Sequence, residues 1–345
     1  MTERVYLDWN ATAPLRPEAR AAMAAAFDVV GNPSSVHAEG RAARAVVERA
    51  RAQVAAALGA AGSDVVFVSG ATEAAALAMA GRGLATAPIE HEAVAAWGDG
   101  RLAVAPSGAV AVDAPEGVAL QMANSETGIL QDLPDGLAVS DMTQAFGKVP
   151  LAFDWSGVGM ALVSAHKIGG PKGVGALVIR RGLDVAARIR GGGQEMGRRS
   201  GTENLPGIAG FGAAAEAAAR DLEQGAHRRV AQLRTFLETS LERAGGPTIL
   251  VGKDSPRLPN TSCFLTPGWK GETQVMALDL AGFAVSAGSA CSSGKVRGSA
   301  VLGAMGFGPG EADCAIRVSI GPGTTERELE RFAETFLRLR NRRRG

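Results

Sequence analysis

The chain alternates between short apolar runs and longer segments in which alanine and charged residues recur at helical spacing. Residues 17–27 and 38–58 have this helical pattern, whereas DVVFVSG (64–70) is an apolar run that ends in glycine. Residues 72–81 again have helical spacing and begin with Thr72. A strand, a glycine turn and a helix in succession are typical of an α/β protein, because the helix covers the sheet that the strand joins.

The alternation continues along the rest of the chain. The apolar runs predict strands near 102–105, 118–123, 137–141, 161–164, 173–181, 261–265, 283–288 and 314–321. Helices are predicted over 205–244, as one long element with a charged face, and over 301–306 and 325–341. Strands and helices in alternation favour a mostly parallel sheet covered by helices, and the last hundred residues predict a smaller α+β domain.

Composition narrows the class of protein. The length of 345 residues favours two domains, and the net charge of +1 gives no reason to expect nucleic acid or a membrane as the main partner. The first residues, MTERVYLDWN, are charged and lack the apolar core of a signal peptide, and no apolar run reaches membrane-spanning length. Three widely spaced cysteines argue against a disulfide framework, so we expect a cytoplasmic protein in a reducing compartment.

One of the three cysteines has unusual surroundings. Cys263 and Cys314 lie in apolar strands, where a thiol packs as a small hydrophobe. Cys291 lies instead in SAGSACSSGK (286–295), among serines and glycines that favour neither a helix nor a core. The sequence leaves two interpretations open, an idle loop thiol or a thiol that must move and react.

A lysine at the end of a strand is a second candidate for chemistry. Lys167 follows an apolar run and precedes a glycine turn in SAHKIGGPKG (164–173). A desolvated lysine amine with a lowered pKa could form a Schiff base, although an ordinary surface lysine is the commoner case. The stretch is not a nucleotide-binding loop, because it lacks the Gly-Lys-Ser/Thr ending.

Polar residues elsewhere fit a pyridoxal site without requiring one. Asp141 ends a predicted strand, three residues before Gln144, and could either pair with a protonated pyridine nitrogen or cap a helix. His91, in IEHEAV, could stack on a flat ring or carry protons, or could be structural. His227 lies among charged residues and is expected on a solvated face.

Ten motifs together resemble one family from end to end. The matching segments, in the order of the family, are YLDWNATA (6–13), GNPSSVHAEGRAAR (31–44), VSGATEAAALA (68–78), IEHEAV (89–94), ANSETG (123–128), DMTQAFGK (141–148), SAHKIGGPKGVGAL (164–177), GGGQEMGRRSGTEN (191–204), SAGSACSSGK (286–295) and IRVSIGPGTT (316–325). With these segments the chain is similar to the cysteine desulfurases of the NifS/IscS type, which are class V, fold-type I pyridoxal phosphate (PLP) enzymes.

The resemblance implies contacts to the ring of the cofactor. Lys167 would hold PLP through a Schiff base, and His91 would stack on the ring and take part in proton transfer. Asp141 would pair with the ring nitrogen and Gln144 with the ring hydroxyl.

It also implies a phosphate site and composite active sites. Ala71, Thr72, Ser164 and His166 would hold the phosphate. Thr202 would reach the phosphate of a neighbouring subunit, which implies a homodimer.

On the substrate side, the resemblance implies that Arg317 clamps the carboxylate of L-cysteine and that Asn10 lines the site. Cys291 would attack the sulfur of the bound substrate and become a persulfide while alanine leaves, and either Lys295 or the cofactor site would favour its thiolate. A glycine and serine loop would supply the travel that this thiol needs.

The chain departs from the family pattern at three places. Ser125 stands where a second asparagine is usual, so Asn124 and Ser125 are both candidates for the ring contact. Trp9 stands where asparagine is common. Only 32 residues separate His91 from Asn124 and 12 separate Gly128 from Asp141, so covering helices of the cofactor domain are expected to be trimmed.

The resemblance predicts a large PLP-binding domain over 12–244 and a small domain formed by 1–11 and 245–345, which carries the loop of Cys291. It predicts a desulfurase that passes sulfur to an acceptor or iron–sulfur scaffold protein. A selenocysteine lyase or another enzyme of the same fold is the nearest alternative. A non-catalytic scaffold in sulfur trafficking is the alternative from another class, and little bound PLP would identify it.

Overall fold

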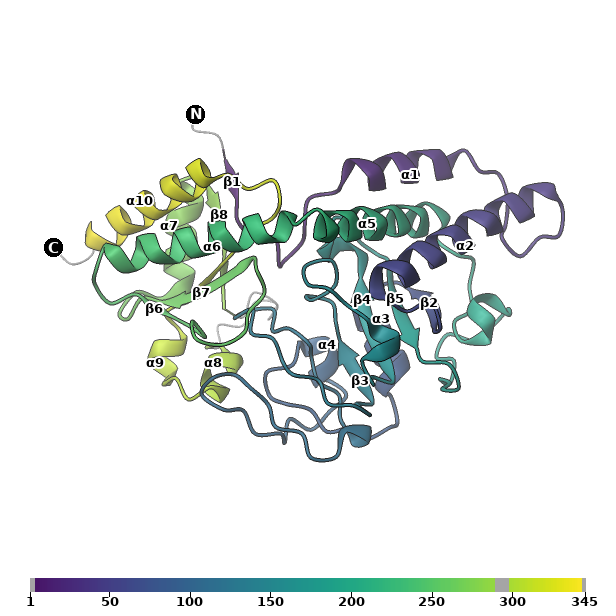
Figure 1. Ribbon diagram of the computed structural model, residues 1–345, viewed down its shortest axis with the longest axis horizontal. Helices are drawn as coiled ribbons and strands as arrows, with labels where there is room; N and C mark the ends of the chain where they lie inside the picture. Colours follow the sequence, from purple (N-terminus) through teal and green to yellow (C-terminus); the bar gives the residue numbers. More distant parts are fainter. Residues whose placement is uncertain (1–3, 289–297, 343–345) are drawn as a thin grey trace.

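The computed structural model describes residues 4–288 and 298–342. Two groups of helices and strands lie side by side in Figure 1. One contains β2 to β5 with α1, α2, α3 and α5, and the other contains β6 and β7 with α6, α7 and α10. Among the helices of the described ranges, none combines the length and apolar character that a membrane crossing needs.

The first sheet has the order β2-β5-β4-β3. Its strands are β2 (Asp64–Val68), β5 (Gly175–Ile179), β4 (Met160–Ser164) and β3 (Val139–Asp141). β3 and β4 are parallel, whereas β5 is antiparallel to both of its neighbours. β2, β3 and β4 therefore run in one direction, but β5 lies between β2 and β4, so this sheet is mixed where the sequence predicted a mostly parallel one. The antiparallel direction of β5 follows from the short connection between Ser164, where β4 ends, and Gly175, where β5 begins. A parallel neighbour would need a longer crossover.

Helices cover both faces of this sheet. α1 (Pro17–Phe27), α2 (Ala38–Leu58) and α5 (Leu205–Glu223) pack together on one face, and α3 (Ala71–Met79) packs on the other. Within β2, Val65 and Phe67 belong to the core under α2, while Val66 and Val68 belong to the core under α3. Burial on both faces explains why this strand is a continuous apolar run and not an alternating one.

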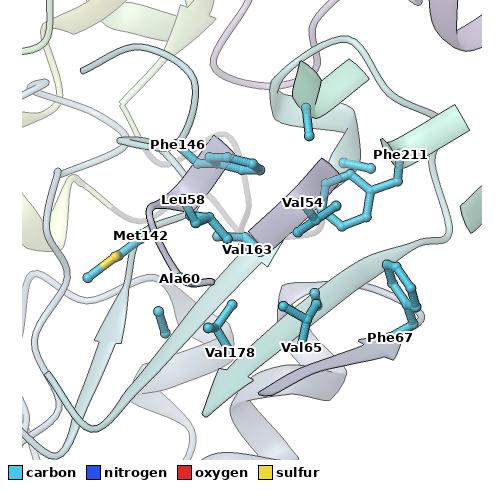
Figure 2. Packing of buried hydrophobic residues seen from close by; sticks show 14 of the residues in the cluster. Val54, Leu58, Ala60, Val65, Phe67, Met142, Phe146, Val163, Val178 and Phe211 are labelled. Atoms are coloured by element: carbon cyan, nitrogen blue, oxygen red, sulfur yellow. The ribbon is translucent and has the colours of Figure 1, made fainter. Parts of the chain in front are cut away.

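Figure 2 shows the larger of these two cores, where side chains of α2 and α5 meet the sheet. Val54 and Leu58 come from α2, and Phe211 of α5 lies edge-on to Phe67 with ring centroids 6.2 Å apart. This packing fixes β2 under the helices, and so fixes the turn that follows β2.

The predicted long helix over 205–244 is two helices. α5 ends at Glu223 and α6 (Ala226–Arg243) begins after Gly225, whose φ of 75° is left-handed. The prediction was wrong because helical spacing continues on both sides of a single glycine. The buried leucines of α6 lie in the core of the second sheet, which favours Gly225 as the division between the two units. The domain limits predicted from the sequence remain a prediction.

The second sheet has the order β6-β7-β10-β9 and is antiparallel throughout. Its strands are β6 (Ile249–Leu250), β7 (Thr261–Leu265), β10 (Ala315–Ser319) and β9 (Ser286–Ala287). Near it lie α7 (Gly271–Leu280), α8 (Ala300–Ala304), α9 (Pro309–Ala312) and α10 (Glu326–Arg342). β1 (Val5–Tyr6) pairs in parallel with β8 (Phe283–Ala284), so the N-terminal segment joins this half of the molecule.

The expected short segments between 91 and 141 contain little regular structure. α4 (Glu92–Ala95) is followed by one 3₁₀ turn, Pro115–Gly117, and by isolated bridges before β3. The strand predicted near 102–105 is a single bridge between Val104 and Val110. The other 3₁₀ turns are Phe153–Trp155, Ala165–Lys167 and Gln194–Gly197.

Candidate active site

The C-terminal ends of β2, β3 and β4 meet at one edge of the first sheet, because these strands run in the same direction. The turn after β2 leads to Ala71, β3 ends at Asp141, and β4 ends at Ser164. Gly175 of β5 lies opposite both Ser164 and Val68, and a Cβ on it would lie 2.8 Å from the Cα of Gly70. The glycine allows these chain segments to approach closely. The sequence-predicted residues from three separate motifs are thus brought to one place.

The predicted phosphate residues surround the start of α3. Ala71 and Thr72 form its first turn, and the preceding Gly70 has no capping side chain, so backbone N–H groups are available there. Ser164 is buried at the end of β4, and His166 contacts Thr12, with 3.2 Å between Nδ1 and Oγ1.

Positive charge collects at this edge. Burial, acting together with the charges of Lys167 and Lys172, lowers the pKa of His166 to about 4. The imidazole is therefore neutral at pH 7, in a region that already holds a surplus of positive charge. Free N–H groups and lysines suit a phosphate monoester, so these residues fit the phosphate of PLP.

Lys167 lies in the 3₁₀ turn that follows β4. Its Nζ donates hydrogen bonds to the backbone carbonyls of Asn10, at 2.7 Å, and Ala11, at 2.9 Å. The lysine is half-buried and held, which places its amine at the junction between the sheet edge and the N-terminal segment. This environment differs from that of a solvated surface lysine.

Asp141 and Gln144 lie on the turn after β3. One carboxylate oxygen of Asp141 accepts a hydrogen bond from the amide of Thr143 at 2.9 Å. The Gln144 side chain is buried, and its Nε2 donates to the Asn10 carbonyl at 3.0 Å. Gln144 is buried and Asp141 is half-buried, and their contacts to a cofactor ring remain a prediction.

His91 caps α4, because its Nδ1 accepts a hydrogen bond from the amide of Ala93 at 3.1 Å. The preceding Glu90 is buried, and both of its carboxyl oxygens lie within hydrogen-bonding distance of the Gln121 amide. Burial raises the pKa of Glu90 well above its usual range. The hydrogen bond from the Gln121 backbone amide lowers this pKa, whereas the charge of Asp141 raises it. Glu90 directly precedes His91, one of the predicted ring residues, and motif reasoning gave it no role.

The two candidates at the departure from the family pattern differ in their contacts. The Asn124 oxygen accepts from the amides of Glu126 and Thr127, at 2.9 and 2.8 Å, and its Nδ2 donates to the Ile89 carbonyl at 3.1 Å. Asn124 is thus occupied in holding its own turn. Ser125 is half-buried, and its side chain remains the better candidate for a ring contact.

Arg317 is buried in β10 and holds the N-terminal segment to the Ser125 turn. It donates to a carboxylate oxygen of Asp8 at 2.7 Å and to the carbonyl of Ser125 at 3.0 Å. Its Nε is buried and has no hydrogen-bond partner among the residues that the structure describes. A substrate carboxylate would satisfy that donor.

Asn10 has a different environment from the one expected of a substrate residue. It is 1% exposed, and its amide is bonded on both sides. Nδ2 donates to Thr261 at 2.8 Å and to the Ser125 carbonyl at 3.2 Å, while Oδ1 accepts from Asn260 and Lys148. The substrate contact remains a prediction, and the geometry favours a positioning role for Asn10.

Three further predictions concern residues outside this cluster. Thr202 is exposed on the loop before α5, which is compatible with a contact to another subunit. Cys291, like Lys295, lies outside the described residues. Cys263 is buried, and burial raises its thiol pKa well above the usual range, as expected of a core cysteine.

His227 is not on a solvated face, so that expectation was wrong. The residue is half-buried, and both ring nitrogens are enclosed without a hydrogen bond of good geometry in the described part of the chain. It lines a cavity of about 240 Å³ together with Trp9, Lys148 and Lys167. Charged neighbours in the sequence misled the expectation, because the ring faces inward between the two units.

Sequence reasoning missed the residues that join the two units. Lys148 ends the motif DMTQAFGK, and its spacing of four from Gln144 is a signal for contact between the two side chains. Asn260 and Thr261 gave no signal, because their contacts to Asn10 depend on the folded arrangement.

Comparison with known proteins identifies the family. The model of the aminotransferase class-V family matches residues 5–97 and 92–332. A protein named cysteine desulfurase from Cereibacter sphaeroides is 40% identical over 372 residues, covering 97% of this chain and 95% of the relative. An IscS-like cysteine desulfurase from Mycobacterium tuberculosis is 35% identical, covering 96% of this chain and 95% of the relative.

Solved structures agree with the sequence relatives. A NifS-like protein from Rickettsia africae superposes with a TM-score of 0.89 at 30% identity, covering 98% of this chain and all of the other. The chain therefore belongs to the class-V aminotransferase family, whose fold is the fold-type I architecture of PLP enzymes. Within that family it is similar to the cysteine desulfurases, and its cofactor is PLP.

Proposed function

We propose that this protein is a PLP-dependent cysteine desulfurase, which converts L-cysteine to L-alanine and leaves a persulfide on Cys291. The family and its relatives named cysteine desulfurase support the activity. The observation that carries the assignment of residues is the meeting of Lys167, Asp141 and Gln144 at one sheet edge, next to the segment that Arg317 holds.

The side chains of the site divide the work of such a reaction. Bound PLP supplies an electron sink for the α-carbon of the substrate. Lys167 would hold the cofactor and then move a proton at the substrate, and Asp141 would keep the ring nitrogen protonated. His91 would stack on the ring, and Arg317 would bind the substrate carboxylate.

The thiol of Cys291 would take the sulfur atom. Its thiolate attacks the sulfur of the substrate, so that one S–S bond forms and the C–S bond breaks. The electron pair of the C–S bond remains on carbon and accepts a proton, which yields alanine. Atoms balance as cysteine plus protein thiol giving alanine plus protein persulfide, with no external oxidant.

The persulfide would then pass to an acceptor, for iron–sulfur cluster assembly or for thiolation. We propose that this takes place in the cytoplasm, since Cys263 and Cys314 are free thiols and a persulfide donor needs a reducing compartment.

We also propose a homodimer in which Thr202 reaches the neighbouring site. The loop before Thr202 is held in a costly conformation, with φ of 48° at Glu195 and 58° at Met196. Arg51 donates to both carboxylate oxygens of Glu195, at 2.8 and 2.9 Å, and fixes this conformation. Met196 is left 56% exposed beside a hollow of about 750 Å³, as a surface that a second copy would cover.

The activity can be tested with the purified protein by measuring alanine formed from L-cysteine and the visible absorbance of bound PLP. Lys167→Ala should abolish both signals, and Cys291→Ser should keep the absorbance but lose sulfur transfer. Lys270→Ala, at an exposed lysine, is the matched control and should change neither.

Two outcomes would contradict the proposal. Sulfide release at the wild-type rate by Cys291→Ser would rule out the covalent transfer. A wild-type protein that stays colourless when PLP is supplied would instead favour the scaffold alternative.

A further inference from the structure

Lys148 has no role in the mechanism proposed above, yet it is buried at the centre of the site. It lies at the end of the turn that carries Asp141 and Gln144 and is 6% exposed. Its Nζ donates to Oε1 of Gln144 at 2.6 Å and to Oδ1 of Asn10 at 3.1 Å. Among the described residues these are its two acceptors.

The two hydrogen bonds determine which way the two amides face. A lysine side chain offers N–H donors, so each amide turns its oxygen toward Nζ and its NH₂ group away. The amino group of Gln144 then points away from Lys148 and donates to the carbonyl of Asn10. With the amide reversed, two donors would face each other in a buried place, which is unfavourable.

This direction does not depend on the protonation state of Lys148. Burial lowers the pKa of Lys148 well below its usual range, and the charges of Lys167 and Arg317 lower it further. A neutral amine retains two N–H donors, which match the two acceptors. A charged ammonium would donate to the same two oxygens.

Lys148 also contacts the side chain of Asn10, the residue whose backbone carbonyl accepts hydrogen bonds from Gln144 and Lys167. The Asn10 carbonyl accepts from Lys167 Nζ at 2.7 Å and from Gln144 Nε2 at 3.0 Å. Lys148 and Asn260 hold the side chain of the same residue, each through Oδ1. The backbone carbonyl of one buried residue, Asn10, therefore accepts hydrogen bonds from two of the predicted cofactor residues.

We propose that Lys148 is a positioning residue that orients the Gln144 amide, so that its NH₂ group is presented to the ring hydroxyl of PLP. This inference rests on the proposed function, because Gln144 contacts the ring only if the cofactor binds as the family predicts. Lys148 acts through Gln144 and itself touches no reacting atom.

The test follows the visible absorbance of bound PLP while pH is varied. A donor to the ring hydroxyl oxygen stabilises its negative charge and lowers the pH at which the Lys167 linkage gains a proton. Lys148→Met, which keeps the length of the side chain, should raise the midpoint of the spectral change by about half a unit to one unit, a three- to tenfold change in proton affinity.

Two further variants separate orientation from simple packing. Gln144→Glu keeps a partner for Lys148 but presents no NH₂ group, so it should raise the midpoint in the same direction. In a Gln144→Ala background, Lys148→Met should add no further shift, because the lysine acts through the removed amide. Lys148→Gln, which can still donate one hydrogen bond, should shift the midpoint less than Lys148→Met.

A thermal melt of each cofactor-free variant and the affinity for added PLP complete the test. Lys270→Met, at an exposed lysine, should leave all of these readouts at the wild-type values. Should Lys148→Met fail to fold, Lys148→Gln and Gln144→Glu still provide the comparison.

The proposal is overturned if Lys148→Met melts at a lower temperature but leaves the spectral midpoint unchanged, or if it shifts the midpoint equally in the Gln144→Ala background. Wild-type protein that binds no PLP would instead count against the proposed function. The two failures are therefore distinguishable.

Discussion

His227 should make the protein less stable in mild acid. Burial, acting together with the charge of Lys148, lowers its pKa to about 4. In the unfolded chain the ring takes up a proton near pH 6.5, so stability is complete above that pH and is lost as the pH falls toward 4. From pH 7 to 5 the free energy of unfolding should fall by about 2 kcal/mol through this residue. Urea unfolding of wild type and His227→Phe at both pH values measures the difference.

The aromatic replacement removes the titrating group while it fills similar space. His37→Asn is the control, because His37 is exposed and asparagine can also cap the start of α2. The His37→Asn variant should show the same fall in the free energy of unfolding between pH 7 and 5 as the wild type. An equal loss in His227→Phe would show that the buried ring is not the source.

Single residues could be predicted from the sequence when their chemistry lies in a local motif. Lys167 and Asp141 follow strands, and the position after a strand places them at the sheet edge. Lys148, Glu90 and Asn260 could not be assigned in this way, because their roles come from partners that only the fold brings near. His227 was misplaced for the same reason.

At the scale of elements, the break between α5 and α6 depends on one glycine. Gly225→Ala should reduce the free energy of unfolding by about 1 kcal/mol, since a φ of 75° is unfavourable for a residue with a Cβ. Within the described part of the chain, the nearest atoms beyond the chain neighbours belong to Arg228 and lie 3.8 Å or more from the added Cβ, so the cost comes from backbone conformation and not from a clash.

The neighbouring Gln224→Ala is the matched control, because Gln224 has a φ of −77° and is exposed. Its effect should stay within about 0.5 kcal/mol. Equal effects from the two variants in urea unfolding would contradict the conformational explanation.

Periodicity predicted most of the helices and buried strands but not their directions or interruptions. α1 and α2 begin and end at the predicted residues, since each has long helical spacing with clear ends. The reversal of β5 and the weak pairing near Val104 depend on partners elsewhere in the chain. Local spacing contains no information about those partners.

At the scale of the whole molecule, the proposed dimer gives a direct test. Met196→Glu places a charge on the surface that a second copy would cover, and should weaken self-association at least tenfold in sedimentation equilibrium. Leu280→Glu is the control, because Leu280 is 89% exposed on α7, away from that loop, and should leave association unchanged. A monomeric wild type, or equal effects from both variants, would contradict the assigned interface.

The family and its fold could be read from the sequence, because ten motifs keep their order along the chain. The contacts between the two units could not, since they join Asn10 to residues about 250 and 309 positions away. A motif shows which residue types are present, whereas the contacts between the two units depend on which distant segments pack together.

The pairing of the N-terminal segment with the far end of the chain also has a consequence during synthesis. β1 pairs with β8, and the backbone N–H of Asn10 donates a hydrogen bond to the side-chain hydroxyl of Ser319 in β10. At 5–20 residues per second, Ser319 is made roughly 15 to 60 seconds after Asn10. A nascent chain on the ribosome therefore contains Lys167 and Gln144 long before Asn10, to which both donate, can bond to Ser319. Binding of the cofactor in its final geometry must then follow translation of β10.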